Sequence, residues 1–320
     1  MNYQVFVTRK LPESALDKLR TVADVEIWPD QLPPSKNEII ERIKHKDGLL
    51  CLLTDTIDAE VMDAAPNLKV IANYAVGYDN IDVKAAAQRG IKVGNTPGVL
   101  TETTADLAFS LLLSTARRIV EADKYTREGK WKSWEPMLFL GQDIHHATIG
   151  IVGLGRIGAE VARRAAGFSM RILYFDFLRK PETEETLGAE FVELDTLLKE
   201  SDFISLHVPL TPQTKHMIGK RELELMKPTA ILINTARGSV VDQKALYLAL
   251  KNRTITAAGL DVFEEEPIAP DDPLLQLDNV IVVPHIASAS VATRTKMAFM
   301  AVENVIAGLK GEPMPNEVKE

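Results

Sequence analysis

Cysteine is almost absent from this chain: Cys51 is the single example among 320 residues. One cysteine cannot form an intrachain disulfide, and it is most simply a buried thiol in a reducing cytosol. Histidine is also scarce, and His145 and His146 are adjacent rather than at the spacing of metal ligands. The sequence therefore predicts a cytoplasmic protein that binds no metal.

Long hydrophobic runs and an excess of basic residues are absent as well. Stretches such as GLLCLLT and AILIN are far shorter than the about 20 apolar residues that span a bilayer. MNYQVFVTRK lacks the apolar core of a signal peptide. Asp and Glu (45) outnumber Lys and Arg (37), which gives a net charge of −8 without any basic run. Neither a membrane nor a nucleic acid is expected as a partner.

Two stretches of the chain alternate between short apolar strands and amphipathic helices, which favours parallel sheets with helices on both faces. The last strand is β-branched at residues 280–283, before Pro284 stops it, and is expected to be buried. Helices are predicted at residues 12–22, 35–46 and 82–90. Strands are predicted at residues 3–8, 25–29, 48–53, 68–74 and 91–96, and again at 147–153, 171–176, 202–209, 230–234, 257–262 and 280–284.

A single long helix is predicted at residues 101–127, between the two stretches, and a last helix at about 289–309. Because no strand follows the last helix, we expect it to complete the first domain. The predicted fold is α/β with two doubly wound parallel-sheet domains. A flavodoxin-like substrate domain comprises residues 1–100 and is completed by 288–320, and a Rossmann dinucleotide-binding domain is inserted at 101–287.

The second stretch opens with IGIVGLGRIGAE, in which Gly153, Gly155 and Gly158 have the spacing G-x-G-x-x-G. A strand precedes the motif, and a helix opens at Arg156. In this context Gly153 permits a tight turn, Gly155 lets the backbone approach a pyrophosphate, and Gly158 lets helix and strand pack closely. The helix N-terminus offers free N–H groups to the phosphates. The motif therefore predicts a dinucleotide site.

Asp176 ends the next strand, where a carboxylate can accept hydrogen bonds from both ribose hydroxyls of an adenosine. A carboxylate there repels a 2′-phosphate, so NAD is favoured over NADP. Arg179 and Lys180 follow closely and leave NADP open, either as a solvated surface pair or as partners of the extra phosphate.

Three predicted strand ends carry charged residues: Arg237 after AILIN, Glu266 after AAGLDV, and His285 after VIVVP. Ligands of open parallel sheets bind outside the carboxyl ends of the strands, so the three side chains could reach one crevice. Each also has a plainer interpretation, respectively as a solvated loop arginine, part of an acidic turn, and a structural histidine.

Four motifs, GLGRIG, NTARGSVVD, GLDVFEEEP and PHIAS, resemble those of the D-isomer-specific 2-hydroxyacid dehydrogenases in order and spacing. The resemblance covers essentially the whole chain. Two further segments, NYAVGYDNID and WKSWEPMLFLGQDI, are most similar to the glyoxylate/hydroxypyruvate reductase branch.

The resemblance implies a role for each charged residue. Arg237 would hold the substrate carboxylate and polarise its carbonyl. His285 would be the general acid in reduction and the base in oxidation. Glu266 would pair with His285 and stabilise its protonated form. The backbone of Val76 and Gly77 would hold the substrate carboxylate.

The resemblance also implies the remaining site residues. Asp261 would hold the nicotinamide carboxamide, and Leu53 would contact the substrate. The cofactor groove would be lined by Thr104, Gly153, Gly155, Arg156, Ile157, Gly158, Asp176, Pro209, Thr214, Thr235 and Ala236.

The substrate is predicted to be a short 2-keto acid, glyoxylate or hydroxypyruvate, which is reduced to the D-2-hydroxy acid. The candidate pocket residues are apolar or aromatic, and no Lys or Arg cluster in YAVGYD would receive a second anion. Dehydrogenases of the same family that act on D-lactate, 2-ketogluconate or phosphoglycerate remain alternatives.

Two other classes share features of this sequence. Formate dehydrogenases carry glutamine where this chain has Glu266, which argues against them. A non-enzymatic NAD-sensing co-repressor has the same fold and the same three residues, and turnover would separate it from a dehydrogenase.

The chain departs from many relatives at Ala287, where they carry glycine, and no change of reaction is expected. NADP-preferring members often carry Ser-Arg where this chain has Asp176-Phe177, which supports NAD. The segment with Trp131 and Trp134 resembles the dimer loop of the family, so a homodimer is predicted. Trp134 would either anchor the interface or reach the neighbouring active site.

Overall fold

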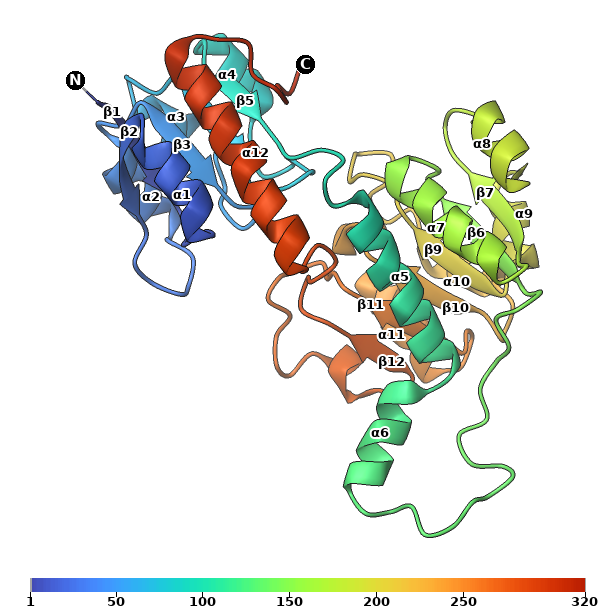
Figure 1. The fold of residues 1–320 in the computed structure, drawn as a ribbon. Helices are drawn as coiled ribbons and strands as arrows, with labels where there is room; N and C mark the ends of the chain where they lie inside the picture. The colour runs from blue at the N-terminus through green and yellow to red at the C-terminus, as the bar shows by residue number, and fades with distance from the viewer. Residues whose placement is uncertain (1, 320) are drawn as a thin grey trace. The chain divides into compact units, whose positions relative to one another are not determined.

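The computed structural model describes residues 2–319 and divides into two compact units (Figure 1). The first unit holds the described residues up to Leu100 together with those from Ser288 onward, and the second holds Thr101–Ala287. Each unit is built on an all-parallel sheet with helices packed on it. The predicted fold class, α/β with two parallel-sheet domains, is confirmed.

The first unit contains a five-stranded sheet in the order β2-β1-β3-β4-β5. The strands β3 and β4 are buried at every residue, as expected for the middle of a parallel sheet that is covered on both faces. The strands are β1 (Tyr3–Val7), β2 (Ala23–Ile27), β3 (Gly48–Cys51), β4 (Val70–Asn73) and β5 (Lys92–Gly94).

Local sequence sets the limits of the helices in this unit. Ser35 and Glu38 form a capping box at the start of α2. Ser290 caps the start of α12, and Gly311, with φ 73°, follows its last residue. Helix α12 packs on β3, β4 and β5 and on α1. The helices are α1 (Glu13–Arg20), α2 (Lys36–Ile43), α3 (Ala59–Asp63), α4 (Val83–Gln88) and α12 (Val291–Lys310).

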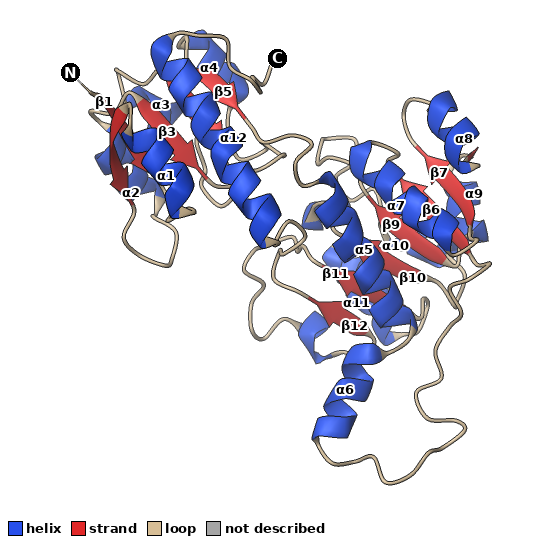
Figure 2. Cartoon of the chain, in the orientation of Figure 1, coloured by secondary structure: helices blue, strands red, loops and turns tan. Residues whose placement is uncertain are grey.

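The second unit contains a seven-stranded sheet in the order β12-β11-β10-β9-β6-β7-β8 (Figure 2). The strand order reverses between β6 and β9, and in open parallel sheets ligands bind beside such a switch point at the carboxyl ends of the strands. The strands are β6 (Thr148–Val152), β7 (Arg171–Phe175), β8 (Glu190–Phe191), β9 (Phe203–Leu206), β10 (Ile231–Asn234), β11 (Ala257–Leu260) and β12 (Val280–Val282).

Helix α5 packs on α7, β10 and β11 and supplies much of the core on one face of this sheet. No helix within residues 2–319 is long and apolar enough to cross a membrane. The helices of the second unit are α5 (Thr101–Ala116), α6 (Ile119–Arg127), α7 (Arg156–Gly167), α8 (Pro181–Leu187), α9 (Leu194–Glu200), α10 (Lys220–Leu225) and α11 (Gln243–Lys251), with 3-10 turns η1 (Gly238–Val240) and η2 (Pro273–Gln276).

The prediction of one continuous helix at residues 101–127 is wrong. The chain leaves the helix after Ala116, and Arg118 adopts a left-handed conformation with φ 53° before α6 begins at Ile119. The ion pair between Arg118 Nε and Glu121 (2.6 Å) holds the turn on the α6 side. A helical hydrophobic pattern continues across the break, so periodicity alone could not locate it.

The prediction that the β-branched strand before His285 is buried is also wrong. Strand β12 lies at the edge of the sheet and pairs with β11 alone, and Val282 is 36% exposed. Apolar composition does not distinguish an edge strand from a central one, because both suit a pleated surface.

Candidate active site

The glycine-rich turn has the geometry that the G-x-G-x-x-G spacing predicts. Gly153 adopts φ 94°, and a Cβ added to it would lie 2.9 Å from the backbone of His207. A Cβ on Gly158 would lie 2.1 Å from the Gly153 carbonyl oxygen, so only glycine allows this close contact of helix and turn. A Cβ on Gly155, the N-cap of α7, would meet no atom within 4 Å. The open space beside Gly155 is where a phosphate can approach the helix N-terminus.

Asp176 is held firmly beside this turn. Its Oδ2 accepts a hydrogen bond from the Leu154 amide (2.9 Å) and its Oδ1 accepts one from the Leu178 amide (3.2 Å). The nearby Arg179 is engaged elsewhere, because its Nε and Nη2 donate to the two carboxylate oxygens of Glu184, each at 2.8 Å. The guanidinium beside Glu184 holds the pKa of that carboxyl at about 2, well below its usual range.

A buried hydroxyl at this edge of the sheet has no hydrogen-bond partner among the described residues. Within residues 2–319, Thr235 Oγ1, just after β10, is buried without a hydrogen-bond partner. Together with the cradle at Gly155, this orphaned hydroxyl fits a polar ligand such as a dinucleotide. The Thr214 hydroxyl, in contrast, donates to the Pro209 carbonyl at 2.6 Å, and Thr104 is buried within α5.

His285 and Glu266 form a direct pair. His285 Nδ1 lies 2.7 Å from Glu266 Oε2, and Glu266 Oε1 accepts from the Phe263 amide at 3.0 Å. Burial acts to raise the pKa of the Glu266 carboxyl. The hydrogen bond and charge of His285, the Phe263 amide and the charge of Arg237 outweigh burial, so this pKa lies below its ordinary value. The carboxylate is therefore ionised at neutral pH and can stabilise a protonated imidazole.

Arg237 follows β10, and its loop is fixed against the loop that carries Glu266. The side chain of Asn234 donates to the Arg237 carbonyl (2.9 Å) and accepts from the Ala236 amide (3.0 Å). A Cβ on Gly238 would lie 1.8 Å from the Phe263 carbonyl carbon, so glycine is needed where the two loops touch. The neighbouring strands β10, β11 and β12 thus bring the segments of Arg237, Glu266 and His285 to one edge of the sheet.

Asp261 anchors the segment that carries His285. Its side chain is fully buried, and its carboxylate oxygens accept from the amides of Ile286 (2.6 Å) and Ala287 (2.9 Å). The Asp261 carbonyl accepts from the His285 amide at 3.0 Å. Burial raises the pKa of Asp261, although the two amides act in the opposite direction. The cofactor role expected of Asp261 stays a prediction, and its contacts with this segment were not predicted from the sequence.

His207 is a second feature that sequence reasoning missed. It follows β9 at the same edge, and its Nε2 lies 2.8 Å from Ser205 Oγ. Burial lowers the pKa of His207 to about 3, so the ring is neutral at physiological pH. The only sequence signal was its position near the end of a predicted strand, two residues before the proposed groove residue Pro209.

In the first unit, the predicted substrate residues lie in two loops at the carboxyl ends of β3 and β4. The Val76 carbonyl accepts from Asn95 Nδ2 at 2.7 Å, and the Gly77 carbonyl accepts from Asn73 Nδ2 at 2.8 Å. Leu53 lies in the other loop and is half-buried. Roles in substrate binding stay predictions for all three residues.

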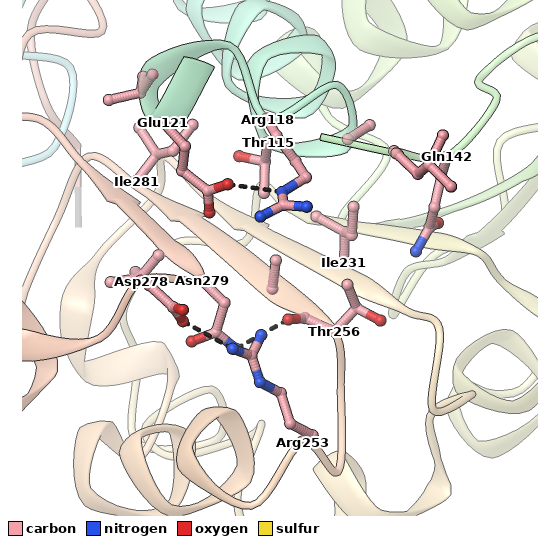
Figure 3. A pocket seen from close by; sticks show the side chains of 16 residues that line it. Thr115, Arg118, Glu121, Gln142, Ile231, Arg253, Thr256, Asp278, Asn279 and Ile281 are labelled. Atoms are coloured by element: carbon pink, nitrogen blue, oxygen red, sulfur yellow. Dashed lines mark hydrogen bonds and ion pairs between the residues drawn. The ribbon is translucent and has the colours of Figure 1, made fainter. Parts of the chain in front are cut away.

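A cavity of about 410 Å³ lies in the second unit, away from the candidate site (Figure 3). Its floor includes Ile231, Ala257 and Val280, which stand at the amino ends of β10, β11 and β12, whereas the charged residues follow the carboxyl ends of these strands. Within residues 2–319, no group of three or more His, Cys, Asp or Glu could hold a metal ion.

The switch point, the glycine turn and the fixed carboxylate after β7 define the second unit as a dinucleotide-binding domain. The family model described as D-isomer specific 2-hydroxyacid dehydrogenase, NAD binding domain, matches residues 109–287. A glyoxylate reductase of Korarchaeum cryptofilum is 62% identical over 100% of this chain and 97% of its own length.

Solved structures agree with the family model. The TT0316 protein of Thermus thermophilus has a TM-score of 0.94 and 49% identity, over 99% of this chain and 100% of its own. An NADPH-dependent glyoxylate/hydroxypyruvate reductase of Sinorhizobium meliloti, solved with NADP and malonate, has a TM-score of 0.87 and 34% identity, over 99% and 97%. The chain belongs to the D-isomer-specific 2-hydroxyacid dehydrogenase family. It is an NAD(P)-dependent 2-hydroxyacid dehydrogenase, which confirms the predicted family, enzyme class and cofactor class.

Proposed function

We propose that this enzyme reduces glyoxylate, hydroxypyruvate or a similarly short 2-keto acid to the D-2-hydroxy acid. The observation that carries the proposal is the 2.7 Å pair of His285 and Glu266, which follow neighbouring strands of the dinucleotide-binding sheet. The names of the relatives, including the glyoxylate reductase that is 62% identical, support the choice of substrate.

Three side chains have separate tasks in the proposed reaction. When bound, NAD(P)H supplies a hydride to the substrate carbon. His285 Nε2 gives a proton to the substrate carbonyl oxygen, while Nδ1 stays bonded to Glu266, whose negative charge stabilises the protonated ring before transfer. Arg237 donates to the substrate carboxylate and polarises the carbonyl. The backbone amides of the loop that contains Val76 and Gly77 also bind the carboxylate.

The test of this proposal is loss of nicotinamide absorbance with purified protein. NADH and NADPH are compared with glyoxylate, hydroxypyruvate, pyruvate, 2-ketogluconate and 3-phosphohydroxypyruvate as substrates. We expect the highest kcat/KM with glyoxylate or hydroxypyruvate. A higher value with 2-ketogluconate or the phosphorylated acid would contradict the substrate assignment, and tight cofactor binding without any turnover would favour a sensor.

Asp176 makes NADH the preferred reductant in this proposal. Its carboxylate is fixed by two amides and would repel a 2′-phosphate, and Arg179 is already paired with Glu184. We expect Asp176→Ala to move the NADH/NADPH ratio of kcat/KM toward NADPH by about 10-fold to 100-fold, because a like-charge contact costs on the order of 1–3 kcal/mol.

The matched control is Arg179→Ala, which removes a charge from the same loop. Because this arginine is paired with Glu184, its loss should change the cofactor ratio less than about threefold, as for a surface ion pair. A ratio that is unchanged by Asp176→Ala, or one that changes more with Arg179→Ala, would overturn this assignment.

The enzyme is a homodimer in this proposal, assembled through residues 119–140, which we call the arm. Both ends of the arm lie near the end of α5, since the Gln142 amide donates to the Ala116 carbonyl at 2.9 Å. In Figure 1 the green α6 and the loop after it project away from the sheet of their own unit. Large apolar side chains are exposed along the arm: Ile119, Val120, Trp131, Trp134, Met137 and Leu140. Such a cluster is typical of a surface that a partner covers.

We expect the double substitution Trp131→Ser and Trp134→Ser to dissociate the dimer, because exposed tryptophans contribute strongly to interface energy. The two rings are 59% and 78% exposed in the single chain. Sedimentation velocity at micromolar concentration should show a dimer for the wild type and a monomer for the variant. Leu32→Ser, which removes a side chain that is 77% exposed in the first unit, should leave the dimer intact. A monomeric wild type would contradict the proposal.

A further inference from the structure

Three consecutive carbonyl groups in the loop after β4 are held by donors from the same unit. The Ala75 carbonyl accepts from the Thr96 amide (2.8 Å), the Val76 carbonyl from Asn95 Nδ2 (2.7 Å), and the Gly77 carbonyl from Asn73 Nδ2 (2.8 Å). Asn73 is fully buried, whereas Val76 and Gly77 are only half-buried. The Gly77 carbonyl is therefore drawn toward the interior of the unit.

The matching N–H groups face the other way. In a trans peptide the C=O and N–H bonds point in opposite directions. Fixing the carbonyls of residues 75–77 therefore aims the N–H groups of Val76, Gly77 and Tyr78 away from Thr96 and the two asparagines. Within residues 2–319, none of these three N–H groups donates to a backbone carbonyl. Adjacent free N–H groups of this kind form a site for an anion.

The asparagines are themselves fixed by a network of amides. Asn73 Nδ2 also donates to Asn80 Oδ1 at 2.9 Å, and Asn80 Nδ2 donates to the carbonyls of Leu52 and Asp55, each at 3.0 Å. These bonds join the loop after β4 to the loop after β3, which contains the predicted substrate residue Leu53.

On the other side, the network reaches the C-terminal part of the unit. Asn304 in α12 is fully buried, and its Nδ2 donates to the Asn95 carbonyl at 2.8 Å. Asn304 Oδ1 accepts from the Asn316 amide at 3.0 Å, and the Asn95 amide donates to the Asn316 carbonyl at 3.2 Å. Asn95 is thus held in place by its backbone while its side chain holds Val76.

We propose that Asn95 and Asn73 are positioning residues that aim the N–H groups of Val76, Gly77 and Tyr78 at the substrate carboxylate, and that Asn304 holds Asn95. The inference rests on the proposed reduction of a 2-keto acid. The asparagines do not touch the substrate, and they act through the peptide groups that they orient. A buried amide suits this task because it carries no charge that would compete with the carboxylate for the N–H groups.

The discriminating variant is Asn95→Asp, which keeps the shape of the side chain but places an oxygen against the Val76 carbonyl. We expect KM for the 2-keto acid to rise about tenfold. If only about a tenth of the molecules keep the loop in the aligned conformation, the apparent affinity for the acid falls by the same factor. The carboxylate persists through the reaction, so its binding is nearly uniform and kcat should change less than about threefold. KM for NADH should stay within about twofold.

Two further variants complete the design. Asn304→Ala removes the hydrogen bond to the Asn95 carbonyl, so it affects the loop only through Asn95. It should raise KM for the acid by about threefold. Trp28→Phe is the matched control, because Trp28 Nε1 donates to the Leu32 carbonyl (2.9 Å) after β2, at the opposite edge of this sheet. It removes one side-chain-to-carbonyl bond from the same unit and should leave KM for the acid unchanged.

A second readout is independent of turnover. In protein labelled with 15N-glycine, the amide resonance of Gly77 should shift when oxalate is added to the wild type, and the titration midpoint should rise about tenfold in Asn95→Asp. If the wild type reduces no 2-keto acid but shows these shifts, the proposed function fails while the inference stands. An unchanged KM and an unchanged titration midpoint in a folded Asn95→Asp, or no shift in the wild type, would overturn the inference.

Discussion

Replacement of His285 by asparagine is expected to lower kcat for 2-keto acid reduction by about 10²–10⁴-fold, the usual contribution of a general acid. Asparagine is the suitable substitute because His285 has φ 51°, a left-handed conformation that asparagine tolerates better than most residues. The variant should therefore keep the contacts of the His285 amide with the Asp261 carbonyl while losing the proton donor. The measurement is steady-state kcat with saturating NADH and acid.

Binding of the cofactor separates a catalytic role from a structural one. The hydrogen bonds of Asp176 involve Leu154 and Leu178, and those of His285 involve other residues. The Kd for NADH in His285→Asn should therefore stay within about threefold of wild type, a change of less than about 1 kcal/mol. A loss of kcat smaller than tenfold would remove His285 from the proposed role. An equal loss in NADH affinity would mean that the substitution had disturbed the domain.

Glu266→Gln tests the partner of the histidine through the pH profile. The pKa of Glu266 lies below its ordinary value, so its carboxylate is fully charged at any pH above the ordinary carboxyl pKa. That charge, which stabilises a protonated imidazole, is lost only as the pH falls through the lowered pKa of Glu266. The carboxylate is thus ionised throughout the neutral range. Without that charge the imidazole loses its neighbouring anion during proton transfer, so kcat for 2-keto acid reduction in Glu266→Gln should fall at every pH at which the wild-type carboxylate is ionised.

The parts of the fold that follow from the sequence are those with local signals. The alternation of strand and helix periods predicts both parallel sheets. The spacing of Gly153, Gly155 and Gly158 predicts the turn, because a side chain at Gly153 or Gly158 would clash and the space beside Gly155 is open. The positions of Arg237 and His285 after strands were also predicted from the sequence. Their place on one edge follows from the rule that parallel strands end together.

Other features depend on neighbours that are distant in the chain. Asp261 accepts from amides of residues 286 and 287, and Asn304 reaches Asn95 across the fold, so no local pattern marks either residue. The break at Arg118 was missed because the helical hydrophobic pattern continues across it, and the edge position of β12 was missed because apolar composition does not distinguish an edge strand from a central one. The only sequence signal of the amide network was asparagine near the ends of the two predicted strands at residues 68–74 and 91–96.

Replacement of Arg237 should have the second large effect, a fall in kcat/KM for the 2-keto acid of about 10²–10³-fold in Arg237→Met. Loss of one partner of a hydrogen-bonded charge pair costs on the order of 3–5 kcal/mol when the site is desolvated. Both binding of the carboxylate and polarisation of the carbonyl would be lost, so KM should rise and kcat should fall together. Kinetics at several acid concentrations with saturating NADH measure both.

Arg237→Lys distinguishes charge from shape. Lysine keeps the positive charge but cannot offer two parallel N–H donors, so most of the loss should remain if the guanidinium binds the carboxylate through two bonds. Arg221→Met is the matched control, because Arg221 donates to both carboxylate oxygens of Asp195 on an exposed surface and should leave kcat/KM unchanged. Full activity in Arg237→Lys would mean that a point charge is sufficient. Full activity in Arg237→Met would exclude this residue from substrate binding.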